Sequence, residues 1–216
     1  MARPRRSQQA RERLLDHGVE VLADQGYHGT GLKELLEALQ IPKGSFYNYF
    51  KSKEDFGAEV VRHYAKAVDD RLDAILSRDG DALTNLKDFF SAIAEHHQEK
   101  QLGCLVGNLG AELGGGYELI RQAMAEGLQA WRDRFEEALA QAQRQGSVRK
   151  DLSARVLADF LLNGFEGALL RMRIEQTTQP IRKFSSLVLN QFFARKYSVN
   201  PSGHHRARPG GALIDS

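Results

Sequence analysis

Cysteine, long apolar runs and net charge are all scarce in this sequence. Its 216 residues include one cysteine and carry a net charge of +2. No apolar run approaches the roughly 18 residues that a membrane-spanning helix requires. A lone cysteine excludes an internal disulfide framework and fits a reducing compartment. The basic N-terminus is not followed by the apolar segment of a secretory signal. We therefore expect a cytoplasmic protein with no membrane partner.

Recognisable metal-binding patterns are also missing. His204 and His205 are adjacent, but no other cluster of histidine or cysteine accompanies them. A structural metal site needs several ligands at characteristic spacings. We therefore predict no metal and no cofactor.

The charge is distributed unevenly, which matters more than its small total. Residues 1–13 contain five arginines and one glutamate. We expect residues 2–6 to form a flexible basic arm. Within it, Arg5 and Arg6 suit DNA phosphates or the minor groove. The alternative is an ordinary solvated terminus.

Apolar residues at helical spacing occur along most of the chain. The apolar content of 42% and the charged content of 27% are ordinary for a protein that buries a core. The period of the apolar positions predicts an all-α fold of about nine helices. We expect short helices in residues 1–52, long helices in 53–197, and a disordered tail at 198–216. In that tail proline, glycine and basic residues replace the helical pattern.

Three short helices are predicted in the first segment, at about 7–24, 30–39 and 43–50. Thr30 is a suitable N-cap for the second, and Pro42 separates the second from the third. Such a pair of short helices predicts a helix-turn-helix, whose later helix enters the major groove of DNA. Ser52 then caps a fourth, longer helix.

The third predicted helix carries polar groups on its outer side. Phe46 and Phe50 are four residues apart, so both can face the core. The outward-facing side chains are those of Lys43, Ser45, Tyr47, Asn48 and Tyr49. A lysine suits phosphate oxygens, whereas serine, tyrosine and asparagine suit base edges, and asparagine can pair with adenine through two hydrogen bonds. The alternative for the two tyrosines is that they only pack.

The stretch from Gly26 to Glu54 resembles the signature of tetracycline-repressor (TetR) transcriptional regulators. The matching residues are Gly26-Tyr27, Thr30 and Ile41-Pro42-Lys43-Gly44-Ser45-Phe46-Tyr47-Asn48-Tyr49-Phe50-Lys51-Ser52-Lys53-Glu54. The resemblance implies that residues 1–52 bind an operator in double-stranded DNA. The implied contacts are Thr30, Lys43, Tyr47 and Tyr49, together with Lys53 at the start of the fourth helix. Asn48 stands where many members carry histidine, so the operator sequence cannot be inferred from a relative.

Residues 53–197 carry six further predicted helices. Their approximate ranges are 53–77, 82–99, 103–113, 118–145, 153–176 and 180–197. The first would connect the DNA-binding unit to an effector-binding and dimerisation domain. The last two have more apolar surface than one domain needs, which predicts a homodimer formed through them. A dimer also fits a palindromic operator, because one short helix reads too few base pairs.

A candidate effector site is centred on Cys104. If residues 103–113 are helical, Cys104, Asn108 and Glu112 share one face beside a leucine ridge, as in a pocket with a few polar groups. A helix N-terminus after Gly103 would lower the pKa of the thiol, whereas Glu112 would raise it. The other candidate effector residues are His97, Trp131, Asn163, Glu166 and Arg171. An ordinary structural role is the alternative for each.

Two segments, GCLVGNLG at 103–110 and FEGALLRMRIE at 165–175, are similar to a subgroup of TetR regulators. That subgroup contains the N-ethylmaleimide-responsive and acrylate-responsive repressors. The similarity implies a small-molecule effector that is a reactive electrophile, an oxidant, or a small unsaturated acid or carbonyl compound. Covalent modification of Cys104 and noncovalent binding beside it both remain open, as does noncovalent sensing of a hydrophobic or drug-like ligand.

Two other functional classes fit the sequence less well. An enzyme that used Cys104 as a nucleophile would need a neighbouring base, and no motif supplies one; His96 and His97 are the nearest candidates. An enzyme would also leave the N-terminal module unexplained. An architectural DNA-binding protein would explain that module but would respond to no small molecule. We therefore predict a regulator and not an enzyme.

Overall fold

The computed structural model describes residues 3–98 and 102–194, with side chains from Gln8 onward. Within these residues the chain forms nine α-helices, one π-helical turn and no strand. The helices are α1 (Arg3–Gly29), α2 (Leu32–Ala38), α3 (Lys43–Phe46), α4 (Lys53–Leu76), α5 (Ala82–His96), α6 (Leu105–Leu113), α7 (Glu118–Gln145), α8 (Ala154–Glu175) and α9 (Gln179–Leu187), followed by the π-helical turn Val188–Phe192. The predicted all-α class is confirmed. The predicted tail at 198–216, with His204 and His205, lies outside the described residues.

The first helix differs from its prediction at both ends. Residues expected to form a flexible arm are helical from Arg3, and the side chains of Arg5 and Arg6 lie outside the described residues. Gly26 breaks the helix with φ 74° but does not end it, since a short turn continues to Gly29. Glycine adopts this left-handed conformation without the steric penalty of a side chain. The break reorients the chain just before α2.

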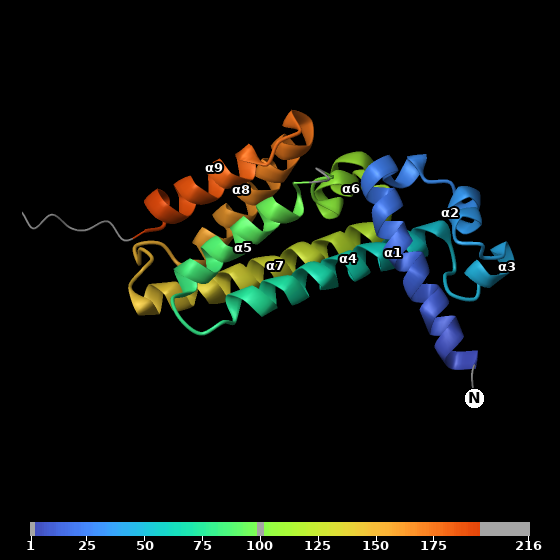
Figure 1. Cartoon of the computed structure of the whole chain (residues 1–216), viewed down its shortest axis with the longest axis horizontal. Coiled ribbons are helices and arrows are strands. Elements are labelled where there is room, and N and C mark those ends of the chain that lie inside the picture. Colours follow the sequence, from blue (N-terminus) through green and yellow to red (C-terminus); the bar gives the residue numbers. More distant parts are fainter. Residues whose placement is uncertain (1–2, 99–101, 195–216) are drawn as a thin grey trace, which may run out of the picture.

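The DNA-binding unit is built on aromatic packing. Phe46 and Phe50 are almost wholly buried, and each ring lies against Phe56 of α4, with centroids 5.5 Å and 5.0 Å away. These contacts fasten α3 to α4, as the sequence predicted. Figure 1 shows α2 and α3 together at one end of the molecule.

Helix α3 is shorter than the predicted 43–50. Its α-helical part ends at Phe46, and the chain continues through a turn in which the Asn48 N–H donates to the Ser45 carbonyl at 3.2 Å. Gly44, Ser45 and Asn48 are weak helix formers. The packing of the two phenylalanines in the core therefore stabilises this segment more than its helix propensity does.

Helices α4 and α7 form the long axis of the second domain and run in the same direction (Figure 1). The Leu119 N–H donates to Glu54 at one end, and the Gln145 side chain donates to the Gly80 carbonyl at the other. A Cβ added at Gly127 would lie 2.9 Å from the Cβ of Ala65, so these helices approach closely. The predicted ends of both helices are confirmed, and left-handed Gly146 terminates α7.

Helices α5, α8 and α9 complete the bundle along α4 and α7. The Ser153 hydroxyl accepts from the Val156 N–H and caps α8. The single helix predicted at 180–197 is instead α9 followed by the π-helical turn, and its last residues lie outside the described part. Among the helices of the described residues, none combines the length and apolar character needed to cross a bilayer.

Candidate functional site

The surface predicted to read DNA is exposed at the tip of the DNA-binding unit. Lys43 and Asn48 are exposed, Tyr47 is 53% exposed, and Ser45 and Tyr49 are partly buried. Tyr49 also packs on the core, so the packing alternative partly holds for it. These positions are compatible with the predicted DNA contacts, which remain predictions.

Two other predicted DNA-contacting side chains form hydrogen bonds within the protein. Thr30 is 2% exposed, and its hydroxyl donates to the Gly26 carbonyl at 2.6 Å. Gly31, not Thr30, is the N-cap of α2, so the predicted cap is wrong. The Lys53 ammonium donates to the Tyr27 carbonyl at 2.7 Å and lies 4.5 Å from the centre of the Tyr27 ring. Both side chains therefore position α2 and α4, and their contacts with DNA stay predictions.

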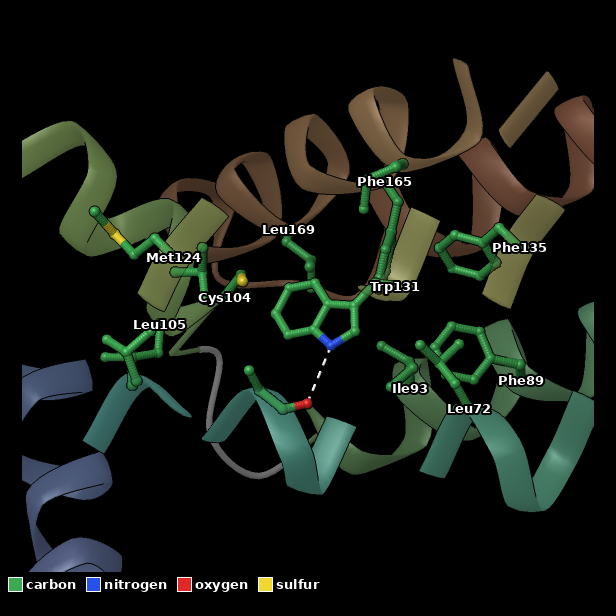
Figure 2. Close-up of a cluster of buried hydrophobic side chains, with 14 of the residues drawn as sticks. Leu72, Phe89, Ile93, Cys104, Leu105, Met124, Trp131, Phe135, Phe165 and Leu169 are labelled. Atoms are coloured by element: carbon green, nitrogen blue, oxygen red, sulfur yellow. Dashed lines mark hydrogen bonds between the residues drawn. The ribbon is translucent and has the colours of Figure 1, made fainter. Parts of the chain in front are cut away.

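A small cavity lies in the second domain, between α4, α5, α7, α8 and the start of α6 (Figure 2). Its volume is about 30 Å³, close to the space of a single water molecule. Its walls are mostly aromatic and aliphatic, with a few polar groups. The lining residues are Tyr64, Val68, Leu72, Phe89, Ile93, His97, Cys104, Trp131, Phe135, Leu162, Phe165, Glu166 and Leu169.

Trp131 forms one wall of this cavity and is also part of the core. It is almost wholly buried, and its indole N–H donates to the Ala65 carbonyl at 3.1 Å, the dashed line in Figure 2. The N–H is therefore already satisfied by the protein. Only the ring of Trp131 is available to a ligand.

Four of the seven predicted effector residues line the inner cavity: His97, Cys104, Trp131 and Glu166. Asn163 and Arg171 do not line the cavity, because both side chains are exposed on α8. Arg171 pairs with Glu175, one helical turn away. Spacing alone could not show which side of α8 faces the bundle.

Asn108 lies outside the inner cavity and lines a separate outer groove. Its side chain donates to the Leu102 carbonyl at 2.8 Å, which fastens the loop before α6. The groove has a volume of about 600 Å³ and is lined by Cys104, Gly107, Asn108, Ala111, Glu166, Gly167, Leu169, Leu170, Arg173 and Ile174. Cys104, Glu166 and Leu169 border both spaces. These residues form the wall between the cavity and the outside.

Three polar side chains meet in this wall. Cys104 is buried, and Tyr64 and Glu166 are partly buried. Burial, followed by the charge of Glu166, raises the pKa of Cys104 well above its ordinary value. Burial also raises the pKa of Glu166 to about 7. The closed site thus favours a protonated thiol.

This result corrects the expected effect of α6 on the thiol. Cys104 is the N-cap residue of α6, where the helix dipole favours a thiolate. Desolvation outweighs that effect, because Cys104 is 4% exposed. Glu112 was expected to raise the thiol pKa from the same helix face. It instead accepts hydrogen bonds from the backbone of α1 at the other end of α6.

Comparison with known proteins identifies the family. Residues 14–60 match "Bacterial regulatory proteins, tetR family", and residues 81–188 match "Tetracyclin repressor-like, C-terminal domain". The HTH-type transcriptional repressor DhaR of Mycobacterium sp. is 34% identical over 182 residues, which cover 82% of this chain and 89% of DhaR. The chain belongs to the TetR family.

Other TetR-family members are similarly close. The transcriptional regulator AcuR of Cereibacter sphaeroides is 34% identical over 190 residues, covering 86% of each chain. The crystal structure of reduced NemR from Escherichia coli superposes with a TM-score of 0.79 at 29% identity, covering 88% of this chain and 99% of NemR. TetR-family proteins are transcriptional regulators and not enzymes, which confirms that prediction.

Tyr64 and Arg173 are site residues that sequence reasoning missed. Tyr64 belongs to the apolar stripe of α4, and only the fold shows that it lines the same cavity as Cys104. Arg173 lines the outer groove, one position beyond buried Met172. Within the part of the chain that the structure describes, no group of three histidine, cysteine, aspartate or glutamate side chains could hold a metal.

Proposed function

We propose that this TetR-family protein is a dimeric repressor that a small molecule releases from a palindromic operator. The effector acts at the cavity bounded by Cys104, Trp131 and Glu166. One observation carries this proposal: α6 begins at the cavity with Cys104 and ends on the DNA-binding unit, where Glu112 contacts α1. A ligand that moves the start of α6 would therefore act on the element that holds the DNA-reading end.

The chemistry of the cavity wall indicates the class of effector. Aromatic and aliphatic side chains would hold a small apolar body, and the Tyr64 hydroxyl and a protonated Glu166 would offer hydrogen bonds to an oxygen. A small unsaturated carbonyl compound or unsaturated acid satisfies both requirements. The cavity of about 30 Å³ is too small for such a molecule, so binding requires the wall to open. That requirement links binding to a change of shape.

Covalent sensing requires the same opening. The reactive form of cysteine is the thiolate, which burial disfavours at Cys104. Opening toward the outer groove would hydrate the thiol and lower its pKa. An electrophile or oxidant could then modify Cys104, and the larger side chain would keep the wall from closing. The similarity to NemR, which has been solved in a reduced form, supports this second mode.

The test is operator release measured by fluorescence anisotropy, on DNA selected from random fragments with the native protein. The compounds are acrylate, a quinone, an aldehyde and hypochlorite. We expect at least one to weaken operator binding by about 5-fold or more, the lower end of typical coupling between sites. Trp131 is the only tryptophan, so its fluorescence reports occupation of the cavity directly.

Cys104→Ser separates the two modes. If release by an electrophile is lost in this variant, while acrylate still quenches Trp131, the thiol is the sensor for the electrophile. Unchanged release in Cys104→Ser would exclude covalent sensing and leave noncovalent binding. If no compound changes operator affinity or Trp131 fluorescence, the proposed effector class is wrong.

A further inference from the structure

Glu112 connects the far end of α6 to the DNA-binding unit through two hydrogen bonds. Its carboxylate accepts from the Tyr27 N–H at 2.9 Å and from the His28 N–H at 2.8 Å. We infer that Glu112 is a positioning residue whose two hydrogen bonds transmit the position of α6 to the DNA-reading helices. This inference rests on the proposed function for the signal, but the contact itself does not depend on any effector.

The backbone of α1 creates the need for this carboxylate. At Gly26 the conformation, φ 74° and ψ 177°, interrupts the helical hydrogen-bond pattern. The amides of Tyr27 and His28, which follow this break, begin a new turn and need acceptors from outside it. Glu112 supplies these acceptors from 84 or more positions along the chain. A side chain at residue 26 would displace it, since an added Cβ would lie 2.4 Å from a Glu112 oxygen.

The segment that Glu112 holds is tied to the start of two other helices. The Gly26 carbonyl accepts from Thr30, just before α2, and the Tyr27 carbonyl accepts from Lys53, the first residue of α4. Helix α3 lies between α2 and α4 in the chain. A displacement of Glu112 would therefore reach both helices that flank the DNA-reading segment. This explains why Thr30 and Lys53 act in the interior of a DNA-binding unit.

Helix α6 connects the cavity at Cys104 to the contact between Glu112 and α1, and glycines lie at both of its ends. It is flanked by Gly103 and Gly114, both with positive φ (78° and 55°), and it contains Gly107 and Gly110. Glycine inside a helix weakens it relative to alanine. Gly107 also allows close packing, since an added Cβ would lie 2.7 Å from a Glu166 oxygen. For this transmission, α6 must shift about its two glycine ends and carry Glu112 with it.

A second carboxylate provides a matched control for this role. Glu54 of α4 accepts from the Leu119 N–H of α7 at 2.9 Å. It joins the first turn of α4 to the start of α7 within the second domain by the same chemistry, and the bond does not pass through α6. Loss of Glu54 should weaken the contact between α4 and α7 without disconnecting the DNA-binding unit from the cavity.

The experiment perturbs the start of α6 without an effector. Cys104→Phe places a ring where about 30 Å³ is free, so the start of α6 must move. Operator affinity is measured for this change in the native, Glu112→Ala, Glu112→Gln and Glu54→Gln backgrounds. Hydrogen exchange at the Tyr27 and His28 amides is followed in each, and thermal unfolding checks that every variant folds.

We expect Cys104→Phe to change operator affinity by about 5-fold or more in the native and Glu54→Gln backgrounds. In Glu112→Ala the same change should have less than about a twofold effect, because the link is gone. Glutamine keeps one acceptor oxygen and should restore part of the response. Exchange at Tyr27 and His28 should rise in Glu112→Ala and should not respond further to Cys104→Phe.

An equal response of operator affinity in the native and Glu112→Ala backgrounds would overturn the inference. So would an absence of response to Cys104→Phe in the native background, provided that the variant folds. If Cys104→Phe unfolds the protein, Leu169→Phe in the same cavity wall takes its place. The two proposals can also fail separately. If no compound releases the operator, but Cys104→Phe weakens operator binding only when Glu112 is present, the proposed effector class is wrong and the role of Glu112 is supported.

Discussion

Glu166 is the acidic residue of the cavity wall whose ionisation changes on folding within the pH range from about 5 to about 8. Burial raises its pKa from the ordinary 4.5 to about 7. Between these two pH values the folded protein binds more protons than the unfolded chain. The contribution of Glu166 is therefore most favourable below about pH 4.5 and is lost as the pH rises through 7. At about 1.4 kcal/mol per pKa unit, the loss is at most roughly 3.5 kcal/mol.

This reasoning predicts the behaviour of Glu166→Gln. The neutral amide has nearly the same shape and cannot ionise, so it should make the protein more stable than the native form at pH 8 but not at pH 5. Urea unfolding at the two pH values measures the difference. Glu175→Gln, at a partly exposed position on the same helix, is the control and should show no such pH dependence. An equal effect of Glu166→Gln at both pH values would contradict the prediction.

Two residues of the surface predicted to read DNA are expected to make different contacts. Lys43 is an exposed cation suited to a phosphate, whereas exposed Asn48 presents an amide suited to a base edge. Lys43→Ala should weaken binding to all sequences and reduce the slope of log affinity against log salt by about 1. Asn48→Ala should instead relax the preference at one base pair. Binding to a library of operator variants at two salt concentrations distinguishes these effects, and identical profiles for the two variants would argue against the assignment.

At the scale of helices, the apolar periodicity predicted where most helices lie. It could not predict which residues of different helices contact each other. Apolar spacing and end signals located α4 and α7 to within a few residues, because both helices bury a continuous stripe and end at strong signals such as Gly146. The early end of α3 was missed because its phenylalanines keep helical spacing after the helix has ended. The partner of Glu112 lies 84 positions away, a distance over which spacing carries no information.

The residues of the candidate effector site were likewise predicted only in part. His97 and Trp131 were predicted because each lies on an apolar stripe, and Cys104 because it is the only thiol. Glu166, Asn163 and Arg171 were chosen for their chemistry, and the rotation of α8 places only Glu166 at the cavity. Lys53 and Thr30 matched a family pattern, and hydrogen bonds that the sequence could not reveal join both side chains to the backbone of α1.

Two glycines of α8 test how closely the helices pack. A Cβ added at Gly164 would lie 2.3 Å from the Phe184 ring of α9, whereas one added at Gly167 would meet nothing within 4 Å. Gly164→Ala should lower the free energy of unfolding by about 1–3 kcal/mol through overpacking. Gly167→Ala should leave it unchanged or raise it by up to about 1 kcal/mol, because alanine favours the helix. Chemical denaturation of both variants gives the comparison, and equal effects would show that α9 adjusts without cost.

At the scale of the whole molecule, the exposed apolar residues gather on the last two helices and the π-helical turn. The large exposed side chains there are Val156, Phe160, Leu170, Ile174, Leu187 and Phe192. An apolar surface of this kind is expected where another protein surface covers it. TetR-family regulators act as dimers, and we propose that α8 and α9 of two copies form the interface. The outer groove includes Leu170 and Ile174, so the partner would also cover part of the entrance beside Cys104.

Ile174→Glu should separate this dimer. Ile174 is 71% exposed in one chain, so a charge there leaves the monomer fold intact, but a charge buried without a partner at an interface is strongly unfavourable. Sedimentation equilibrium should show a monomer where the native protein is a dimer. Operator affinity should fall by at least about 10²-fold, because each half-site would be bound alone and the gain from linked binding would be lost. Leu119→Glu, at an exposed apolar position on α7, is the matched control and should remain dimeric. If Ile174→Glu remains a dimer with native operator affinity, the interface lies elsewhere. The partner would then not cover the entrance beside Cys104.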